Sequence, residues 1–524
     1  MRRIALLALT IAALTAAGTA TAAPASSGVV QTSPSVAATV SVREVLGSTV
    51  PTSASTRSSE PAISADPLDA RRLALVYLHG SGPVQSVVRI SHDGGLTWRN
   101  VRTNPGGGGY HLMVAWGPGP VPGHSRLYFA NMTGSGGGVR LMTRYSDNEG
   151  ASWSSRRIQT DTPAWVGGTP DLTVDTNPAS PNYGVVYATY NWPRSAARGP
   201  GLHIIASGDY GRTFHAVEVP ALPTTVSYPV GDRIGYRLRA APDGGLYVVW
   251  YQADLRYWRL SDPLSKGSLS NIGRIRFAVA RLVYNRAART WHRGPSLTAA
   301  TLPRTAWNAG FIRPGGLTND PQWSPGIVVD PDSGRVSIAI SVDGGIWVYS
   351  SGDLGRTWSY RSLPSPLAVN GRSQWIAKPD LVIGKGFLAV TMKMLDRTGA
   401  TSTHAYSVST DGGRTWSRPH VLSGVRWASA RVSGPVNGVG LRNRATVTAD
   451  GRHIVFAYGD GRYGARGLNR AAVLVSVITI SVPTPPPPTA SPDPTASPEP
   501  TATPTASPDP TATPTASPDP TPAS

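Results

Sequence analysis

The sequence contains no cysteine, so disulfide bonds cannot contribute to its stability. Such a chain must hold its fold by core packing alone, which a fold of several hundred residues can do. The sequence also lacks a His-Glu-x-x-His pattern, a P-loop, a dinucleotide fingerprint and a Gly-x-Ser-x-Gly elbow. Its acidic residues are too scattered to predict a calcium site. We therefore expect neither a metal nor a cofactor.

Long apolar runs are also missing, since nothing beyond the N-terminus approaches the roughly 20 residues that a transmembrane helix needs. The N-terminal run covers residues 4–14, follows Arg2 and Arg3, and precedes the small residues Ala20-Thr21-Ala22. This order of basic, apolar and small residues is typical of a signal peptide. We expect residues 1–22 to be cleaved off and the mature protein to be secreted, either free or associated with the cell wall.

Lysine is scarce, although the net charge is strongly positive at +19. The chain has only Lys266, Lys378, Lys385 and Lys393, so arginine carries nearly all of this charge. One explanation is attraction to an acidic polymer such as a carboxylated glycan. The other is a coding bias that favours Arg, Ala, Gly and Pro. No dense Lys/Arg cluster marks a nucleic-acid footprint, so we do not expect nucleic acid as a partner.

The two ends of the chain are not predicted to fold. Residues 483–524 repeat Pro, Thr, Ser and Ala, and such tracts behave as extended spacers that cannot bury a core. Residues 23–37, between the signal peptide and the first strand-like segment, are expected to be disordered. Residues 38–482 remain for the fold.

What fills residues 38–482 is an eight-residue repeat. The full copies and the decayed ones are residues 91–98 (SHDGGLTW), 207–214 (SGDYGRTF), 351–358 (SGDLGRTW), 409–416 (STDGGRTW), the weaker 146–153 (SDNEGASW) and a remnant ending at 289–291 (RTW). In this unit the Asp side chain bonds nearby backbone N–H groups, and glycine supplies positive φ. Apolar alternation before each copy places it at the tip of a β-hairpin.

A second repeat, out of phase with the first, pairs apolar strands through Asp-Pro or Asp-Gly turns, as at Asp66-Pro67 and Asp243-Gly244. Two hairpins per unit give four strands, which is one propeller blade. The fold class is therefore all-β, a propeller of four-stranded antiparallel blades with seven blades favoured and six possible. Residues 39–46 supply a strand that would complete the last blade and close the ring. The expected inner strands begin near Pro61, His111, Pro170, Arg237, Pro325, Pro379 and Arg444.

The repeated turns resemble the Asp-box (BNR) repeats of the sialidase superfamily. The resemblance covers most of residues 60–480 and implies that the boxes are scaffold on the face away from any active site. Their key positions are Asp93, Asn148, Asp209, Asp353 and Asp411. The resemblance also implies an exo-α-sialidase type of hydrolase, in which arginines hold the carboxylate of an acidic sugar and a tyrosine replaces the usual carboxylate nucleophile.

The residues just before each inner strand are expected to crowd around one mouth of the channel. The candidate site residues are chosen from these positions and from the loops that lead to them. If the protein is a hydrolase, the resemblance implies Tyr228 as nucleophile, Glu60 as its activator and Asp171 as acid/base. The expected substrate-binding residues are Arg233, Arg237, Arg444, Trp323 and Lys378. Arginine at these positions can instead pair with a loop carboxylate, Asp171 can cap a turn, and Trp323 can pack between blades.

Two functions stay open. The first is a secreted propeller, expected to be a monomer, that binds and, if catalytic, hydrolyses extracellular carbohydrate. The second is a non-catalytic propeller that serves as a scaffold for protein or cell-wall interactions. At Ser58-Ser59-Glu60-Pro61 the sequence departs from the resemblance, which implies an arginine there.

Overall fold

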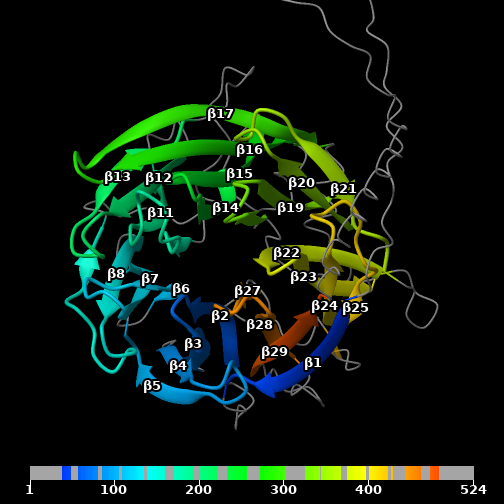
Figure 1. Cartoon of the computed structure of the whole chain (residues 1–524), viewed down its shortest axis with the longest axis horizontal. Coiled ribbons are helices and arrows are strands. Elements are labelled where there is room, and N and C mark those ends of the chain that lie inside the picture. Colours follow the sequence, from blue (N-terminus) through cyan, green and yellow to red (C-terminus); the bar gives the residue numbers. More distant parts are fainter. Residues whose placement is uncertain are drawn as a thin grey trace, which may run out of the picture. The chain divides into compact units, whose positions relative to one another are not determined.

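The computed structural model describes fifteen stretches and one dipeptide of the chain, and every element in them is a β-strand. These are residues 38–48, 57–80, 85–105, 109–134, 139–159, 170–193, 200–220, 233–255, 272–302, 325–342, 344–366, 374–396, 401–422, 427–428, 443–461 and 472–482. A membrane-spanning helix is therefore not found among the described residues. The strands form seven antiparallel sheets, which stand as blades around a common centre (Figure 1).

In each blade the first strand named lies at the channel and the last lies at the outer edge. Blade 1 is β2 (Arg57–Asp66), β3 (Asp69–Gly80), β4 (Gln85–Ser91) and β5 (Arg99–Thr103). Blade 2 is β6 (Tyr110–Pro118), β7 (Ser125–Gly134), β8 (Val139–Ser146) and β9 (Arg157–Ile158). Blade 3 is β10 (Leu172–Val174), β11 (Val186–Pro193), β12 (Pro200–Ser207) and β13 (His215–Glu218). Blade 4 is β14 (Arg233–Ala240), β15 (Gly245–Leu255), β16 (Ile272–Asn285) and β17 (Thr290–Leu302).

Blades 5 to 7 follow the same order. Blade 5 is β18 (Gly326–Val329), β19 (Val336–Val342), β20 (Gly345–Ser351) and β21 (Ser359–Ser362). Blade 6 is β22 (Gln374–Gly384), β23 (Phe387–Asp396), β24 (Thr401–Ser409) and β25 (His420–Val421), with β26 (Trp427–Ala428) also paired to β24. Blade 7 is β27 (Arg444–Val447), β28 (His453–Asp460), β29 (Ala472–Ser481) and β1 (Thr39–Leu46).

The all-β propeller prediction is confirmed, with seven blades and not six. The last blade takes its outer strand from the start of the chain, because β1 pairs with β29 from Thr39↔Ser481 to Leu46↔Leu474. The predicted closing strand is therefore confirmed with the same boundaries. Closure joins blade 7 to the N-terminal segment and leaves β29 without an open edge.

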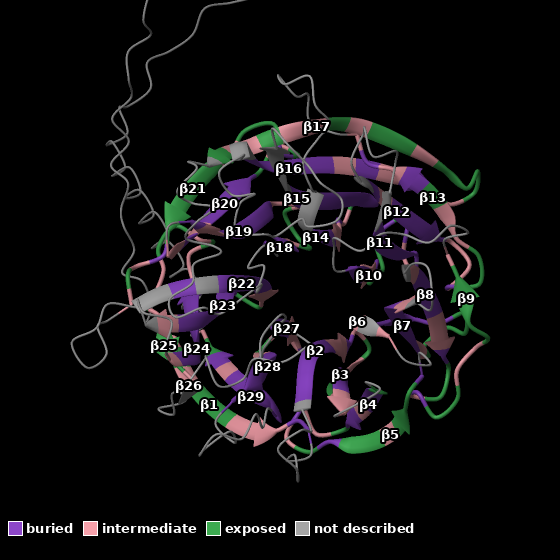
Figure 2. Cartoon of the chain, turned by 180° about the vertical axis from the view of Figure 1, so that it is seen from behind, coloured by how far each residue is buried: buried purple, intermediate pink, exposed green. Residues whose placement is uncertain are grey.

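The core lies between the blades, where the apolar faces of neighbouring sheets meet (Figure 2). Blade 7 packs on blade 1 through Val455 and Val475 against Leu73 and Tyr77. The strands read as apolar runs because both of their faces are buried, so a period-2 pattern is weak in β3 and β28. Large aromatic side chains such as Trp250 fill the junctions and are fully buried.

Side chains of the inner strands also bond the backbone of the next blade. The Ser64 hydroxyl accepts from Trp116 N at 2.9 Å, and the Thr446 hydroxyl accepts from Ala65 N at 3.2 Å. These bonds link blade 1 to blade 2 and blade 7 to blade 1. They satisfy inner-strand N–H groups that have no strand partner on the channel side.

Five eight-residue turns share one hydrogen-bond geometry. In blade 1, Asp93 accepts from Leu96 N at 3.0 Å, from Thr97 N at 2.9 Å and from the Thr97 hydroxyl at 2.6 Å. Asp209, Asp353 and Asp411 repeat the bonds to the threonine, and Asn148 uses a serine in its place. Partial burial alone would raise the pKa values of Asp93, Asp209 and Asp411. The hydrogen bonds to each carboxylate outweigh burial and hold these pKa values below the ordinary one.

The fourth residue of these five turns has positive φ, which glycine adopts without cost and leucine adopts only with backbone strain. Blades 1 and 6 place Gly94 (φ 76°) and Gly412 (φ 71°) there, whereas blade 5 places the exposed Leu354 at φ 62°. We expect Leu354→Asn to raise the free energy of unfolding by about 0.5–1 kcal/mol, because asparagine adopts this conformation more readily. Denaturant unfolding would measure it.

The reciprocal change provides the control. Nothing lies within 4 Å of a Cβ built on Gly412, so Gly412→Leu changes backbone strain without a clash. It should lower the free energy of unfolding by about 1 kcal/mol. Equal stability of all three proteins would show that φ at this position does not limit the turn.

Candidate functional site

The inner strands define two mouths of the central channel. Leu73 pairs with Ser91, so the turn between the first two strands and the eight-residue turn lie at the same end of a blade. We call this end the turn face. The opposite end, where the inner strands start and the chain passes from blade to blade, is the loop face. The predicted site residues precede or begin the inner strands and therefore belong toward the loop face.

Four inner strands carry a β-bulge near the loop face. In each, two residues lie opposite one residue of the second strand. The bulged pairs are Glu60-Pro61, His111-Leu112, Gly235-Tyr236 and Lys378-Pro379. A bulge bends the strand and re-aims its side chains, and bulges are common beside active sites. The repeated bulge thus sets one polar layer of the channel wall.

Three bulges start with a strained residue that is not glycine. Glu60, His111 and Lys378 have φ of 52°, 59° and 52°. Left-handed backbone at such residues costs about 1–3 kcal/mol each and clusters at functional sites. Glu60 and Lys378 are also buried, which adds the cost of desolvating a charge. Strain and buried charge at the same level mark this layer as a candidate site.

Glu60 and His111 form a pair across the first two blades. Glu60 Oε2 accepts from the backbone N of His111 at 3.2 Å and lies 3.4 Å from its Nδ1. The glutamate is buried, whereas the His111 side chain retains 17% exposure. The imidazole is therefore the part of this pair that solvent or a ligand can reach.

Below the bulges, one ion pair spans the channel. Arg444 Nη2 of blade 7 donates to Asp171 Oδ1 of blade 3 at 2.7 Å, and the same nitrogen lies 3.5 Å from Met113 Sδ of blade 2. Asp171 Oδ2 accepts from Leu238 N of blade 4 at 2.9 Å. Both members of the pair are buried. Residues from three blades thus meet on the Asp171 carboxylate, and Met113 of a fourth blade contacts its arginine partner.

The charges around Asp171 keep it ionised. Burial alone would raise the pKa of Asp171, but the guanidinium groups of Arg444, Arg237 and Arg239, with the Leu238 N–H, outweigh burial and hold it below its ordinary value. A general acid at neutral pH needs a raised pKa. In this environment Asp171 is suited to anchor arginines, and the predicted acid/base role would require them to move.

The structure adds Asp380, which the sequence reasoning missed. This buried carboxylate accepts a hydrogen bond from Ala445 N, the residue after Arg444, at 2.8 Å. In the same way Asp171 accepts from Leu238 N, the residue after an arginine. Within the described chain its second oxygen has no hydrogen-bond partner. A signal for it was present, because Pro379-Asp380-Leu381 repeats Pro170-Asp171-Leu172.

The remaining predicted residues fall in three groups. Tyr228 and Trp323 lie outside the described residues, as does the side chain of Arg233, whose backbone pairs with Gln252 at the start of β14. The turn residues Asp93, Asn148, Asp209, Asp353 and Asp411 lie at the turn face, away from the bulges. Arg237 directly follows the bulge of blade 4, is buried and acts on Asp171.

The layer brings together both signs of charge. With the ion pair directly beside it, the layer contains Glu60, Asp171 and Asp380 against Arg237, Arg444 and Lys378, with His111 close to Glu60. Guanidinium groups bind carboxylates in a two-pronged geometry, and a His–Glu pair can move a proton. Among the described residues no group of three or more metal-ligating side chains is placed to hold a metal ion.

Comparison with known proteins gives remote structural likenesses only. No family model and no curated protein matches the sequence. Among solved structures, an α-L-arabinofuranosidase from Fusarium graminearum is 13% identical with a TM-score of 0.40, covering 67% of this chain and 92% of that chain. An α-L-arabinanase from Penicillium chrysogenum is 16% identical with a TM-score of 0.38, covering 68% and 94%.

A Hadza microbial sialidase is 14% identical with a TM-score of 0.38, covering 78% of this chain and 74% of that chain. At these identities and TM-scores the likenesses carry no argument about activity.

Proposed function

We propose that this protein is an exported propeller that binds an anionic extracellular glycan at the loop face of its channel. The observation that carries the proposal is the layer of bulges that holds Glu60, His111 and Lys378 in strained conformations around the axis. A purely structural channel wall gains nothing from strain and buried charge at the same level. A ligand site does, since both fix side chains before binding.

The charge of the layer favours an anionic partner. Arg237, Arg444 and Lys378, with His111, lie against three carboxylates, and two of these, Asp171 and Asp380, are held by backbone N–H groups as well. The chain as a whole carries +19, which would draw a polyanion toward it. Arginine and lysine beside the axis then supply the groups that hold a sugar carboxylate.

The location and the family are part of this proposal. The basic start, short apolar run and Ala20-Thr21-Ala22 support export through a signal peptide. The shared turn geometry, in which Asp, Gly and Thr recur at fixed spacing, supports membership of the Asp-box sialidase superfamily. We further propose that the mature protein is a monomer, since the ring closes on itself through β1 and β29.

Hydrolysis is the second candidate, and the Glu60–His111 pair favours it. The partly exposed imidazole, 3.4 Å from the buried carboxylate, can pass a proton between Glu60 and the channel. The finer proposal is an exo-α-sialidase type, with Tyr228 as nucleophile and Glu60 as its activator. Without catalysis the same layer serves binding alone. The alternative is a non-catalytic scaffold for protein or cell-wall interactions.

A glycan array and a fluorogenic sialoside test both candidates on the mature protein. Lys378→Met is expected to weaken binding of acidic glycans about tenfold or more, because it removes a charged donor from the site. Lys385→Met is the matched control: Lys385 is an exposed lysine beyond the other end of β22, and its loss should leave binding unchanged.

Turnover decides between binding and hydrolysis. If the protein is catalytic, Glu60→Gln should abolish fluorophore release while glycan binding persists. Binding without release would support the lectin-like candidate. No binding and no release in the unmodified protein would overturn the proposed function.

A further inference from the structure

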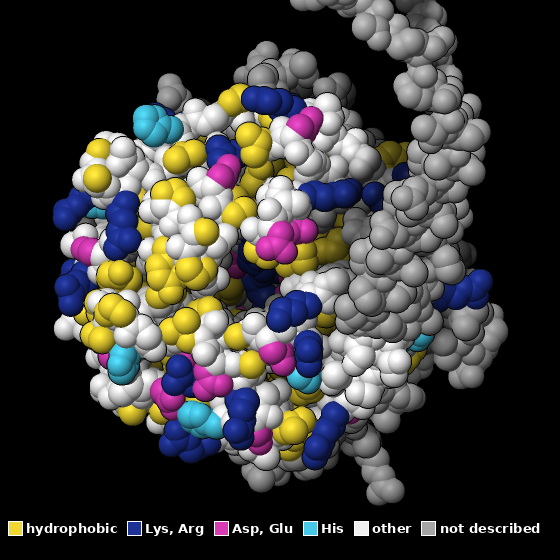
Figure 3. Space-filling model, viewed as in Figure 1, with side chains coloured by type: hydrophobic (Ala, Val, Ile, Leu, Met, Phe, Trp, Pro, Cys, Tyr) yellow, Lys and Arg dark blue, Asp and Glu magenta, His cyan; other side chains and the backbone are white. Residues whose placement is uncertain are grey.

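A cavity of about 480 Å³ lies in the half of the channel nearer the turn face. The Arg444–Asp171 pair bounds it on the side of the loop face. All seven inner strands contribute to its wall, and neither Glu60, His111, Arg237 nor Lys378 lines it. Figure 3 shows charged side chains in the depth of a hollow at the centre of the ring. The ion pair therefore separates this cavity from the bulged layer.

We propose that this cavity is a second binding site, which takes a small organic anion of about monosaccharide size. Its volume falls in the range of small-ligand pockets, which combine mostly apolar walls with a few convergent polar groups. This site is independent of the proposed function at the loop face. Its cation is Arg239, which lines the cavity, and the cavity shares only the Arg444–Asp171 pair with the loop-face layer. It opens toward the opposite face.

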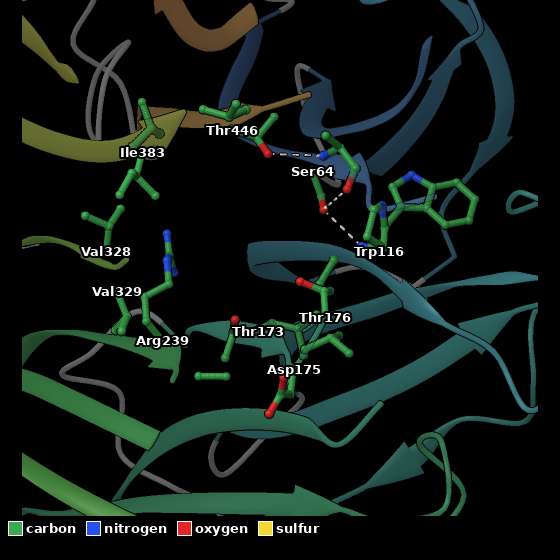
Figure 4. A pocket seen from close by; sticks show the side chains of 18 of the residues that line it. Ser64, Trp116, Thr173, Asp175, Thr176, Arg239, Val328, Val329, Ile383 and Thr446 are labelled. Carbon is green, nitrogen blue, oxygen red and sulfur yellow. Dashed lines mark hydrogen bonds between the residues drawn. The ribbon is translucent and has the colours of Figure 1, made fainter. Parts of the chain in front are cut away.

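Arg239 supplies the charge for an anion. Its guanidinium extends into the cavity from β14, and its side chain is only 26% exposed (Figure 4). Within the described chain it makes one hydrogen bond, from Nη1 to the carbonyl of Leu238 at 2.7 Å. Asp171 Oδ2 lies 3.9 Å away, beyond hydrogen-bond distance. Most donors of this guanidinium thus remain for a ligand.

The carboxylates around the cavity are already committed. Asp171 serves Arg444, and Asp66 is bound by Arg72, with Nε donating at 2.6 Å. Asp175 accepts from the Ser180 hydroxyl and from Asn177 N. None of these carboxylates makes a hydrogen bond to Arg239 within the described residues. An incoming anion would therefore meet a cation whose charge is under-compensated.

The rest of the wall suits the body of such a ligand. Val328, Val329 and Ile383 form an apolar side near Arg239 (Figure 4). Ser64 and Thr446 add hydroxyl groups on the other side. This combination favours a carboxylate on a ring or short chain, because the apolar side packs its carbons while the guanidinium holds its charge.

Calorimetric titration with glucuronate, and with glucose as its neutral counterpart, tests the inference on the mature protein. Glucuronate should bind and glucose should bind at least about tenfold more weakly, because a guanidinium–carboxylate bond is lost. Arg239→Met should reduce glucuronate affinity to the same degree, and Arg239→Lys should restore part of it. Arg414→Met removes an exposed arginine of the turn face and should change nothing.

Lys378→Met separates this site from the loop face. Retained glucuronate binding in Lys378→Met with loss in Arg239→Met supports the second site, even if the loop face binds no glycan. Loss in Lys378→Met with retention in Arg239→Met would assign the ligand to the loop face and overturn the inference. Absence of glucuronate binding to the unmodified protein would overturn it as well.

Discussion

A chain that lacks residues 38–48 is expected to lose its closed ring and to unfold at much lower denaturant concentration than the full-length protein. The deletion removes β1, whose eight residues pair with β29. It also removes the bonds from Gly47 N and Ser48 N to Val473 O, at 2.9 and 3.1 Å. At roughly 0.5–1.5 kcal/mol for each hydrogen bond, the loss of a whole strand is on the order of 5 kcal/mol or more.

The same segment ties blade 7 to blade 1, which enlarges the effect. Arg89 Nη1 of β4 donates to the carbonyl of Gly47 at 2.7 Å, and Val45 packs on the core between these blades. Without β1, the strand β29 would present a row of unpaired backbone groups, which promotes association between chains. Size-exclusion chromatography should therefore show dimers or larger species.

Two controls sharpen this test. Deletion of residues 23–37 shortens the same end of the chain and should leave unfolding unchanged. A synthetic peptide of residues 38–48, added to the deleted chain, should restore the elution volume of the full-length protein and part of its stability by strand addition, and a scrambled peptide should not. If the deletion variant and the full-length protein unfolded at the same denaturant concentration, the pairing of β1 with β29 would contribute nothing to the free energy of unfolding.

The fold was predictable because its signals are local and repeated. An Asp that bonds the backbone three and four residues later, followed by Gly and Thr, specifies a turn without help from distant residues. Repetition of that turn fixed the blades, and residues 39–46 were the strand-like segment left over to complete the seventh. Even the degenerate copy at Asn148 keeps the geometry, with Ser152 in the threonine position.

The bulged layer was not predictable in the same way. Proline at 61 and 379 suggested the first residue of an inner strand, since proline cannot donate to a ladder. The structure instead begins these strands earlier, at Arg57 and Gln374, and places each proline second in a bulge. A bulge tolerates proline equally well, so the residue type alone cannot distinguish the two.

The channel-spanning pair was beyond sequence reasoning for a different reason. Arg444 and Asp171 are 273 positions apart and belong to blades that are not neighbours. Their contact depends on how the ring closes, which no local pattern encodes. Both residues were predicted to face the channel mouth, and the predicted roles of clamp and acid/base did not include their pairing.

Arg444→Met is expected to lower the free energy of unfolding by about 3–5 kcal/mol at pH 7, because it leaves a buried carboxylate without its closest cation. Arg237 and Arg239 still face Asp171, which places the effect nearer the lower figure. Asp171→Asn in the same chain should recover most of the loss, since it removes the unpaired charge. Urea unfolding of the two single variants and the double variant would give the coupling energy.

The pH dependence provides an independent readout. In the unmodified protein the pKa of Asp171 is lowered, so the ion pair contributes stability above the carboxylate's ordinary pKa of 3.8 and loses it as pH falls through the lowered value. In Arg444→Met that pKa should rise, because burial then meets less opposing charge. The stability gap between the two proteins should therefore narrow on acidification.

Arg281→Met supplies the scale for this result. Arg281 pairs with Asp243 at the surface, where both side chains are partly exposed, so its loss should cost at most about 1 kcal/mol. If Arg444→Met cost as little as Arg281→Met, the buried pair would not hold the channel together. Arg444 would then be free to turn toward a ligand, as a substrate clamp must. A large cost would instead leave anion binding at the loop face to Arg237 and Lys378.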